Sequence, residues 1–181
     1  TTAGFRDVLL IGRQKRYETY DLYMDKPAPL VARRNVFEVI ERVGPNGEVD
    51  KELETASLDA IIETLAESTI QSVAVSLIHA YANPTHENII KKILQARLPN
   101  LLVSLSSDIS PKFREYERTS TTVANAYVRP IVADYISQLQ STLGARGVEN
   151  EMFIMQSAGG LISTSIAIEE PVRIVESGPA A

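Results

Sequence analysis

The chain has 181 residues, of which 44% are hydrophobic and 23% charged, as expected for a globular protein with a buried core. Its formal net charge of −5 argues against nucleic acid or an anionic membrane as the main partner, since both are bound through clustered cations. The absence of cysteine excludes disulfides, thiolate catalysis and cysteine-ligated zinc, and fits a cytoplasmic protein. The longest apolar runs, such as residues 73–78, are far too short to cross a membrane.

Residues 1–54 are predicted to form an N-terminal segment that contains a β-hairpin. Pro27 and Pro29 close a first stretch of mixed aromatic and polar residues. The β-branched residues of 35–43 favour a strand, although both of its faces mix apolar and charged side chains. The sequence GPNGEV (44–49) then supplies a Pro-Asn-Gly turn, so the chain is expected to double back as a hairpin.

Residues 55–181 are predicted to form a β-α-β-α-β core, preceded by a helix. Apolar residues at helical spacing in 58–65 predict that helix. The runs at 72–78 and 101–106 are typical of buried parallel strands. Asn83-Pro84 predicts the start of the helix between them, because Asn caps helices and Pro suits the first turn. A long helix and a third strand at 152–156 follow.

This order of elements predicts an α/β fold. Strand, helix, strand, helix, strand implies parallel strands joined by right-handed crossovers. The expected architecture is therefore a mainly parallel sheet with crossover helices plus the antiparallel hairpin, with residues 1–181 as one domain.

The long helix is predicted to begin at Ser110-Pro111 and to cover residues 111–143, with one broad apolar side. Pro130 is expected to kink it or to separate two helices, because its ring clashes with the preceding turn. The apolar side consists of Val123, Tyr127, Ile131, Tyr135, Leu139 and Leu143, flanked by Ala124, Val128, Val132 and Ile136.

A second side of this helix is polar, and it leaves two interpretations open. It carries Arg114, Arg118, Thr121, Asn125 and Arg129, with Glu115 and Glu117 beside them. One interpretation is a solvated face with local ion pairs. The other is a surface that faces an anion or substrate, because paired guanidinium groups bind carboxylate or phosphate well. The run TSTT has poor helix propensity and favours a role beyond helix formation.

The remaining candidates for chemistry form no complete active site. His79 and His86 have no carboxylate partner that the sequence reveals, so structural hydrogen bonds are favoured over catalysis or metal binding. Residues 156–160, QSAGG, follow a strand, where glycines permit either close approach to a ligand or a tight turn. Neither a P-loop nor a dinucleotide fingerprint is present, and Ser157 and Ser177 lack a nucleophile elbow.

Several phrases together carry a family resemblance. TTAGFRDVLLIGRQ, LIHAYANPTHE, SLSSDISPKFREYERTSTTVANAYVRP, MQSAGGL and PVRIVESGPAA occur in this order along the chain. They resemble the hydantoinase A / 5-oxoprolinase family, which includes ATP-dependent N-methylhydantoinases and the matching subunits of acetone and acetophenone carboxylases. The resemblance implies half of an actin/Hsp70-like ATPase built from ribonuclease-H-like halves. It also implies that the chain is an internal fragment lying between two phosphate loops.

The function that the resemblance implies is ATP-dependent hydrolysis of a cyclic amide, a hydantoin or 5-oxoproline, through phosphorylation of its carbonyl. The expected cofactors are ATP and Mg²⁺ in the parent protein, with none in the fragment, which is expected to be inactive alone. The expected partners are the small cyclic amide and a hydantoinase B-like subunit or domain, without nucleic acid or membrane. Alternatives are a ketone carboxylase subunit and a non-catalytic module for subunit interaction.

The resemblance also selects candidate residues that face substrate or nucleotide, without assigning a catalyst or a metal ligand. They are Arg114, Glu115, Glu117, Arg118, Thr119, Asn125, Ser157, Gly159, Gly160, Ser177 and Gly178, with Pro179 beside them.

Overall fold

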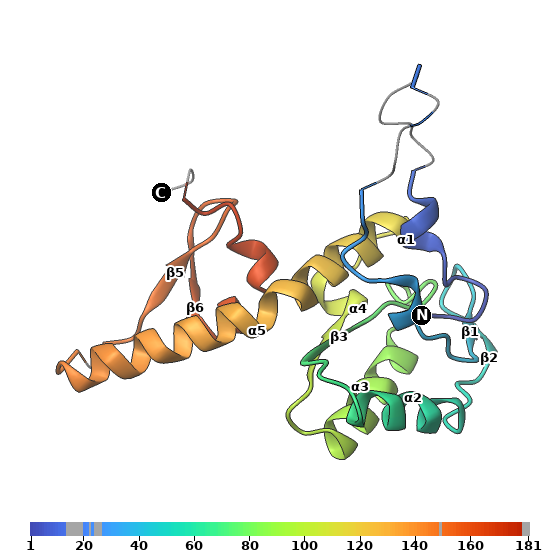
Figure 1. Ribbon diagram of the computed structural model, residues 1–181, viewed down its shortest axis with the longest axis horizontal. Helices are drawn as coiled ribbons and strands as arrows, with labels where there is room; N and C mark the ends of the chain where they lie inside the picture. The colour runs from blue at the N-terminus through green and yellow to red at the C-terminus, as the bar shows by residue number, and fades with distance from the viewer. Residues whose placement is uncertain (14–19, 22, 24–26, 149, 179–181) are drawn as a thin grey trace.

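A single long helix organises the molecule. The computed structural model describes residues 1–13, 20–21, 23, 27–148 and 150–178. Figure 1 shows helix α5 (Glu115–Ala145) running from the larger N-terminal part of the molecule into an arm that carries the C-terminal residues. Every helix in the described residues is too short or too polar to span a bilayer.

The described residues form short helices and three separate two-stranded sheets. The other helices are α1 (Val8–Ile11), α2 (Ser57–Ala66), α3 (Thr85–Arg97), α4 (Ser106–Ile109) and α6 (Thr164–Glu169), with 3-10 turns η1 (Arg33–Asn35) and η2 (Pro171–Arg173). The strands are β1 (Arg42–Val43), β2 (Val49–Lys51), β3 (Ser72–Val75), β4 (Leu102–Leu105), β5 (Phe153–Met155) and β6 (Leu161–Ser163).

The parallel unit is smaller than the sequence predicts. Strands β3 and β4 pair in parallel and α3 connects them, as expected. The predicted third strand is a correction, because β5 pairs antiparallel with β6 instead of joining that sheet. The physical reason is the length of α5: its 31 residues extend ~45 Å at ~1.5 Å per residue, and so carry the chain away from β3 and β4. The α/β class holds, but a mainly parallel sheet is wrong for the described residues.

The first hairpin is confirmed, although its strands are short. Strands β1 and β2 pair antiparallel, and the amide of Gly44 donates to the carbonyl of Glu48 across the turn (2.8 Å). Most of the predicted strand 35–43 does not join this pair. The backbone of Val39 bonds instead to Thr1 and Ala3, because that segment lies beside the start of the chain.

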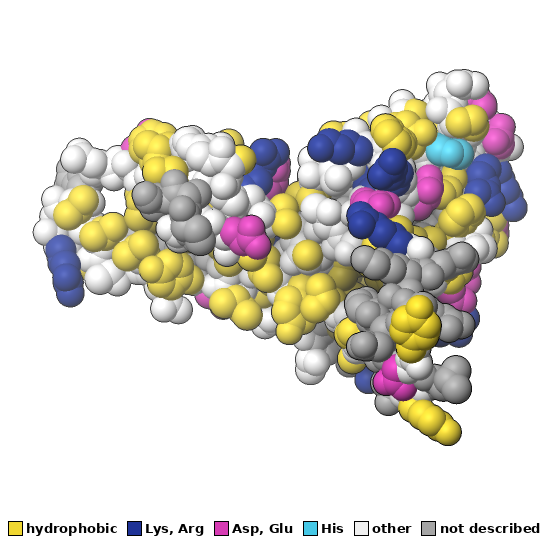
Figure 2. All heavy atoms as spheres, turned by 90° about the horizontal axis from the view of Figure 1, so that it is seen from above, with side chains coloured by type: hydrophobic (Ala, Val, Ile, Leu, Met, Phe, Trp, Pro, Cys, Tyr) yellow, Lys and Arg dark blue, Asp and Glu magenta, His cyan; other side chains and the backbone are white. Residues whose placement is uncertain are grey.

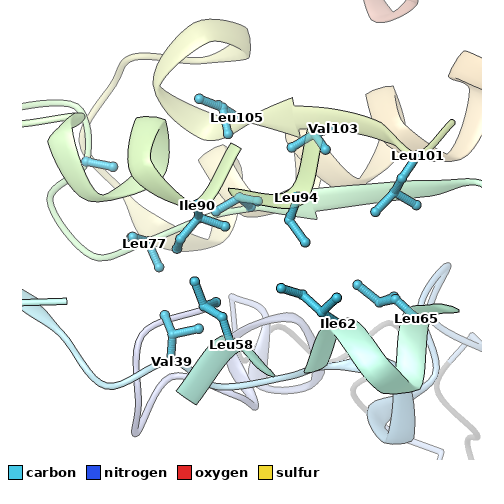
Figure 3. Packing of buried hydrophobic residues seen from close by; sticks show 12 residues of the cluster. Val39, Leu58, Ile62, Leu65, Leu77, Ile90, Leu94, Leu101, Val103 and Leu105 are labelled. Carbon is cyan, nitrogen blue, oxygen red and sulfur yellow. The ribbon is translucent and has the colours of Figure 1, made fainter. Parts of the chain in front are cut away.

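The core lies between the β3–β4 pair and helices α2 and α3. Figure 3 shows Leu58, Ile62 and Leu65 of α2 pointing toward Leu77, Ile90 and Leu94. Helix α5 covers the opposite face of the pair, where the side chains are small and polar. Because both faces of this parallel pair are covered, the sequences around β3 and β4 are short and mostly apolar.

Helix α5 begins later than Ser110-Pro111 predicts, and Pro130 does not divide it into two helices; a kink at Pro130 stays a prediction. The chain first forms the single turn of α4, and α5 begins only at Glu115, after Arg114 with a φ of 79°. The helix then continues through Pro130. Proline lacks the amide that would bond to the carbonyl of Ala126. The hydroxyl of Ser72 donates to that carbonyl instead (2.5 Å), so the helix does not end there.

Candidate functional site

The two parallel strands end side by side, and open α/β sheets bind ligands at this edge. The loops at 76–84 and 106–114 follow β3 and β4, and the first turns of α5 lie against them. We call this region the carboxyl edge. The predicted helix residues up to Thr119 lie here, whereas Ser157 and Gly159 belong to the C-terminal arm (Figure 1).

Arg118 joins the two loops of the carboxyl edge. Its side chain is 2% exposed and donates to the carbonyls of Leu77 (2.9 Å) and Lys112 (3.0 Å). Its guanidinium carbon lies 5.4 Å from the centre of the Tyr81 ring, which is a cation–π distance. Burial lowers the pKa of Arg118 from its ordinary value. The solvated-face interpretation is therefore wrong for this residue.

Arg114 and Arg118 do not form a shared anion clamp. Arg114 is exposed, and its guanidinium lies over the ring of Phe113 at 5.6 Å. Arg118 points inward and uses both terminal nitrogens on backbone carbonyls. The exposed Arg114 is held in a left-handed conformation that non-glycine residues rarely adopt, a form of strain often found at functional positions.

Glu87 is a second buried charged residue at this edge, and the sequence analysis missed it. Its carboxylate accepts from the amide of Leu77 (2.9 Å), the hydroxyl of Ser106 (2.7 Å) and the amide of Ser107 (2.9 Å). Burial raises the pKa of Glu87, against the opposing effect of these hydrogen bonds. One signal was available: Glu87 falls on the same side of its helix as Ile90 and Leu94, where a carboxylate needs internal partners.

His86 has a carboxylate partner that lies 45 residues earlier in the sequence. Its Nδ1 lies 2.8 Å from the carboxylate of Glu41, and both side chains are buried. Glu41 also accepts a short hydrogen bond from the hydroxyl of Thr2, which in turn accepts from the amide of Ile78 (2.9 Å). The structure thus shows the structural hydrogen bonding that was favoured for histidine, together with the carboxylate that the sequence did not reveal.

His79 also makes a structural contact. It adopts a φ of 53°, and its Nδ1 lies 2.8 Å from the carbonyl of Val43 in the hairpin. Its ring meets that of Tyr81 edge to face. The two histidines therefore tie the hairpin to the loop and helix that follow β3.

Threonine hydroxyls account for the run TSTT within α5. Those of Thr121 and Thr122 donate to the carbonyls of Glu117 and Arg118, one turn earlier (2.8 and 2.7 Å). The hydroxyl of Thr119 lies 2.8 Å from that of Ser76, so it contacts the residue after β3.

The two acidic residues of the first turn, Glu115 and Glu117, are half-buried at the start of α5, where the helix dipole favours negative charge. Glu117 pairs with Arg13 (2.9 Å). A hydrogen bond from the backbone and then the contact with Arg13 lower the pKa of Glu117. Glu115 and Glu117 thus lie beside Arg114 and not in the buried network.

Asn125 connects the parallel pair to the C-terminal arm. It is fully buried, and its amide nitrogen donates to the hydroxyl of Ser104 and the carbonyl of Glu169, both at 3.0 Å. Its side-chain oxygen accepts from the amide of Val172 (3.1 Å). Three elements thus meet at one side chain, and the solvated-face interpretation is wrong here too.

Three large residues of the predicted apolar side of α5 are exposed in this structure, although Val123 and Ile136 on that side are buried. Tyr127, Ile131 and Tyr135 are 59%, 71% and 65% exposed, whereas Arg118 and Asn125 on the polar side are buried. Figure 2 shows hydrophobic side chains at the surface along the arm that α5 and the following hairpin form. The residues that α5 buries therefore include members of both of its predicted sides: Arg118, Thr122, Val123, Asn125, Ala126 and Ile136.

The turn at Ser157 lies in the C-terminal arm. Gly159 and Gly160 have φ values of 85° and 86° and close the β5–β6 hairpin. The hydroxyl of Ser157 accepts a hydrogen bond from the amide of Glu176 (3.0 Å), and the amide of Ser157 donates one to the carbonyl of Arg173 (2.7 Å).

The loop that follows is the last described part of the chain. The amide of Ser177 donates to the carbonyl of Ile174 (3.1 Å), and Gly178 is exposed. Pro179 lies outside the described residues. The structure therefore places the residues around Ser157 and Ser177 together, and Asn125 connects η2, which lies beside them, to the end of β4.

No metal centre can be built from the described part of the chain. It contains no group of three or more His, Asp or Glu side chains that could hold a metal ion. The carboxyl edge therefore consists of buried, hydrogen-bonded side chains, with the exposed Arg114 at its rim in a backbone conformation that non-glycine residues rarely adopt.

The fold and site define an α/β domain segment with a buried polar layer at the ends of a parallel strand pair. Residues 1–98 match the hydantoinase/oxoprolinase N-terminal region, and residues 118–181 match hydantoinase/oxoprolinase. The chain therefore belongs to the hydantoinase/oxoprolinase family, which confirms the resemblance seen in its sequence.

Similar proteins include enzymes that act on cyclic amides. The chain is 41% identical over its full length to Uncharacterized protein MJ0964 of Methanocaldococcus jannaschii, of which it covers 27%. It is 32% identical over 99% of its length to caprolactamase subunit alpha of Pseudomonas jessenii, of which it covers 26%. It is 32% identical over 90% of its length to the 5-oxoprolinase of Saccharomyces cerevisiae, of which it covers 14%.

Two solved structures share the fold. The ATP-dependent caprolactamase of Pseudomonas jessenii aligns with 99% of the chain at a TM-score of 0.89 and 32% identity. Nucleotide-free acetone carboxylase aligns with 98% at a TM-score of 0.76 and 24% identity, which shows the fold alone. The chain covers 26% of each, so the 181 residues span about a quarter of these proteins.

Proposed function

We propose that the chain is part of an ATP-dependent enzyme that hydrolyses a cyclic amide. The observation that carries this proposal is the match to the ATP-dependent caprolactamase, at 32% identity and a TM-score of 0.89 over 99% of the chain. The similarity to a 5-oxoprolinase supports the same substrate class. We further propose that the parent protein is cytoplasmic and contains an actin-like ATPase half.

The chemistry of this reaction requires an activated carbonyl. Transfer of a phosphoryl group to the amide oxygen makes a good leaving group, and water then opens the ring. ATP with Mg²⁺ would supply the phosphoryl group and neutralise its charge. Mg²⁺ in such enzymes is held largely by the phosphates of the nucleotide, together with one or two protein carboxylates.

The role that we propose for this chain is to form one wall of the cleft between the two halves of the parent ATPase, where substrate and nucleotide would bind. Arg118, Glu87 and Asn125 are buried and hydrogen-bonded to backbone and side-chain groups, so we propose that they hold the loops in place. The exposed Arg114 and the turn at Ser157 are the positions we propose for contact with substrate or nucleotide.

Two other functions remain candidates because specific observations favour them. The acetophenone carboxylase gamma subunit of Aromatoleum aromaticum is 28% identical over the full chain, which favours a ketone carboxylase subunit. The exposed Tyr127, Ile131 and Tyr135 of α5 favour a module for subunit interaction. A partner subunit of the hydantoinase B type is compatible with all three functions.

The test is a substrate panel with the full-length protein that contains these residues, with and without its partner subunit. ADP formation should depend on a cyclic amide such as 5-oxoproline, a hydantoin or caprolactam. ADP formation that depends on acetone or acetophenone with bicarbonate would support the carboxylase instead. Absence of ATP turnover with every substrate would favour the interaction module. The 181 residues alone should show a cooperative thermal transition without hydrolysing ATP.

A further inference from the structure

A cavity of about 710 Å³ lies beside the first turns of α5. Helix α1 forms one wall and residues 27–30 form another, and Figure 1 shows α1 next to the start of α5. Sites for small molecules commonly enclose about 300–1,000 Å³, so the cavity is large enough for one. The exposed Arg114 directly precedes α5, so the cavity lies beside the rim of the carboxyl edge and outside its buried network.

Most of the wall of this cavity is apolar. Residues 9–11 of α1 and residues 27–30 line it, and all of them are leucine, isoleucine, proline or alanine. Gly12 ends α1 against the ring of Tyr116, which a Cβ on Gly12 would meet at 3.6 Å. This close approach brings the end of α1 onto α5. A wall of this composition suits the methylene groups of a small ring.

One ion pair interrupts the apolar wall. The Nε of Arg13 donates to the carboxylate of Glu117 (2.9 Å), and both residues line the cavity. Among the described residues, the two terminal nitrogens of Arg13 make no hydrogen bond. The lowered pKa of Glu117 keeps its carboxylate ionised at neutral pH, with lone pairs left to accept further bonds. The cavity therefore presents a hydrogen-bond donor and an acceptor side by side.

We propose that this cavity binds the cyclic amide, with Arg13 donating to the carbonyl oxygen and Glu117 accepting from the N–H group. The inference rests on the cyclic-amide function proposed above and gives that substrate a site within this chain. A small lactam ring holds its amide in the cis form, so its N–H and C=O lie on one edge of the ring. Open-chain secondary amides prefer the trans form, in which the two groups point in opposite directions. The pair of Arg13 and Glu117 therefore selects cyclic amides over open-chain ones.

This binding mode is compatible with phosphorylation of the carbonyl. An amide oxygen has two lone pairs, so a bond from Arg13 occupies one and leaves the other for the phosphoryl group. The apolar residues of α1 and of 27–30 would contact the rest of the ring. Binding by Arg13 and Glu117 thus fixes which edge of the substrate is held and which atom remains open to attack.

Binding measurements on the full-length protein test the proposal without requiring turnover. Titrations followed by saturation-transfer NMR give the Kd of caprolactam, 5-oxoproline and hydantoin. The fully N-methylated form of the tightest binder has no N–H group for Glu117, and should bind about tenfold more weakly or worse. N-Methylacetamide, whose amide is trans, should also bind weakly. Equal affinity for the tightest binder and its N-methylated form would overturn the proposal.

Two variants test the residues themselves. Arg13→Leu and Glu117→Leu should each raise the Kd and the KM for the cyclic amide by about tenfold or more, with the KM for ATP unchanged. Arg97→Leu is the matched control, because Arg97 forms an exposed ion pair with Asp59 (3.0 Å) outside the cavity. A lower Tm in both variants without any change in amide binding would show a purely structural ion pair and overturn the proposal. If a variant does not fold, the comparison with N-methylated amide decides.

The outcomes separate the site from the enzyme activity. Turnover of a cyclic amide that neither variant alters would overturn the site and leave the proposed function standing. Binding that depends on Arg13 and Glu117, without any turnover, would support the site and contradict the hydrolase. Absence of both binding and turnover with every cyclic amide would overturn both.

Discussion

The hydroxyl of Ser72 donates to the carbonyl of Ala126, which Pro130 leaves without its helical partner. Ser72→Ala should therefore lower the free energy of unfolding by about 1 kcal/mol, the usual contribution of one hydrogen bond. In a Pro130→Ala background the amide of residue 130 supplies the missing bond, so the same change should cost less.

A double-mutant cycle measured by urea denaturation checks this coupling. The expected interaction energy between the two positions is about 0.5–1.5 kcal/mol. Ser141→Ala, on an exposed face of α5, should change stability by less than about 0.5 kcal/mol. Equal costs of Ser72→Ala in both backgrounds would show that the two residues act independently.

Asn125 satisfies three groups at once, so its loss should be severe. Asn125→Ala leaves the carbonyl of Glu169 and the amide of Val172 without partners, and should cost about 2–3 kcal/mol. Thermal denaturation by circular dichroism gives the comparison. Gln138→Ala, exposed on the same helix, is the control and should have little effect. A small loss for Asn125→Ala would indicate that water replaces the amide.

Glu87 should make stability depend on pH. Burial raises its pKa above the ordinary value of 4.5, so the folded chain holds this proton to a higher pH than the unfolded chain. Its contribution to the free energy of unfolding is therefore greatest below pH 4.5 and declines as the pH rises through the folded pKa. Glu87→Gln removes this decline, so the variant should gain stability relative to the parent chain as the pH rises.

Urea denaturation between pH 4 and 8 measures this difference. Glu63→Gln is exposed on α2 and should show no such trend relative to the parent chain. If the stability difference between Glu87→Gln and the parent is constant over the range, Glu87 is ionised in the folded chain and the raised pKa is wrong.

Replacing either of two glycines by alanine should change the stability of the chain, and the two changes should have opposite signs. A Cβ at Gly144 or at Gly159 would meet nothing within 4 Å, so sterics with other residues do not separate them. Gly144 is helical, and Gly144→Ala should stabilise the chain by about 0.5–1 kcal/mol. Gly159 has a φ of 85°, and Gly159→Ala should cost about 1–2 kcal/mol. Melting temperatures of the two variants check the signs; a loss at both positions would contradict the backbone argument.

Ser157→Ala should separate function from stability in the full-length protein. The hydroxyl accepts one hydrogen bond, from the amide of Glu176, in the half-exposed turn that we propose to face the cleft. We expect a marked loss of ATP-dependent turnover with a small change in melting temperature. Ser141→Ala serves as the control. A fully active Ser157→Ala enzyme would restrict Ser157 to the hairpin.

The sequence alone determined the helices and strands whose apolar residues recur at a regular spacing or form a continuous run. The apolar spacing of 58–65 forms α2, and the apolar runs at 72–78 and 101–106 contain β3 and β4. The Pro-Asn-Gly turn produces the first hairpin. These features depend on short-range pattern and on burial in water, which a sequence records directly. The sequence segments that resemble the hydantoinase A / 5-oxoprolinase family can also be recognised without the structure.

Only the tertiary structure decided which polar residues of α5 are buried and which of its apolar residues are exposed. A guanidinium, an amide or a hydroxyl is satisfied equally by water or by a buried carbonyl, so the sequence leaves the choice open. Arg118 and Asn125 are buried because carbonyls of Leu77 and Glu169 meet them, whereas Ile131 is exposed because no described element covers it. The partners of Glu41 and Glu87 were hidden for the same reason: they lie on other elements, and the fold brings them together.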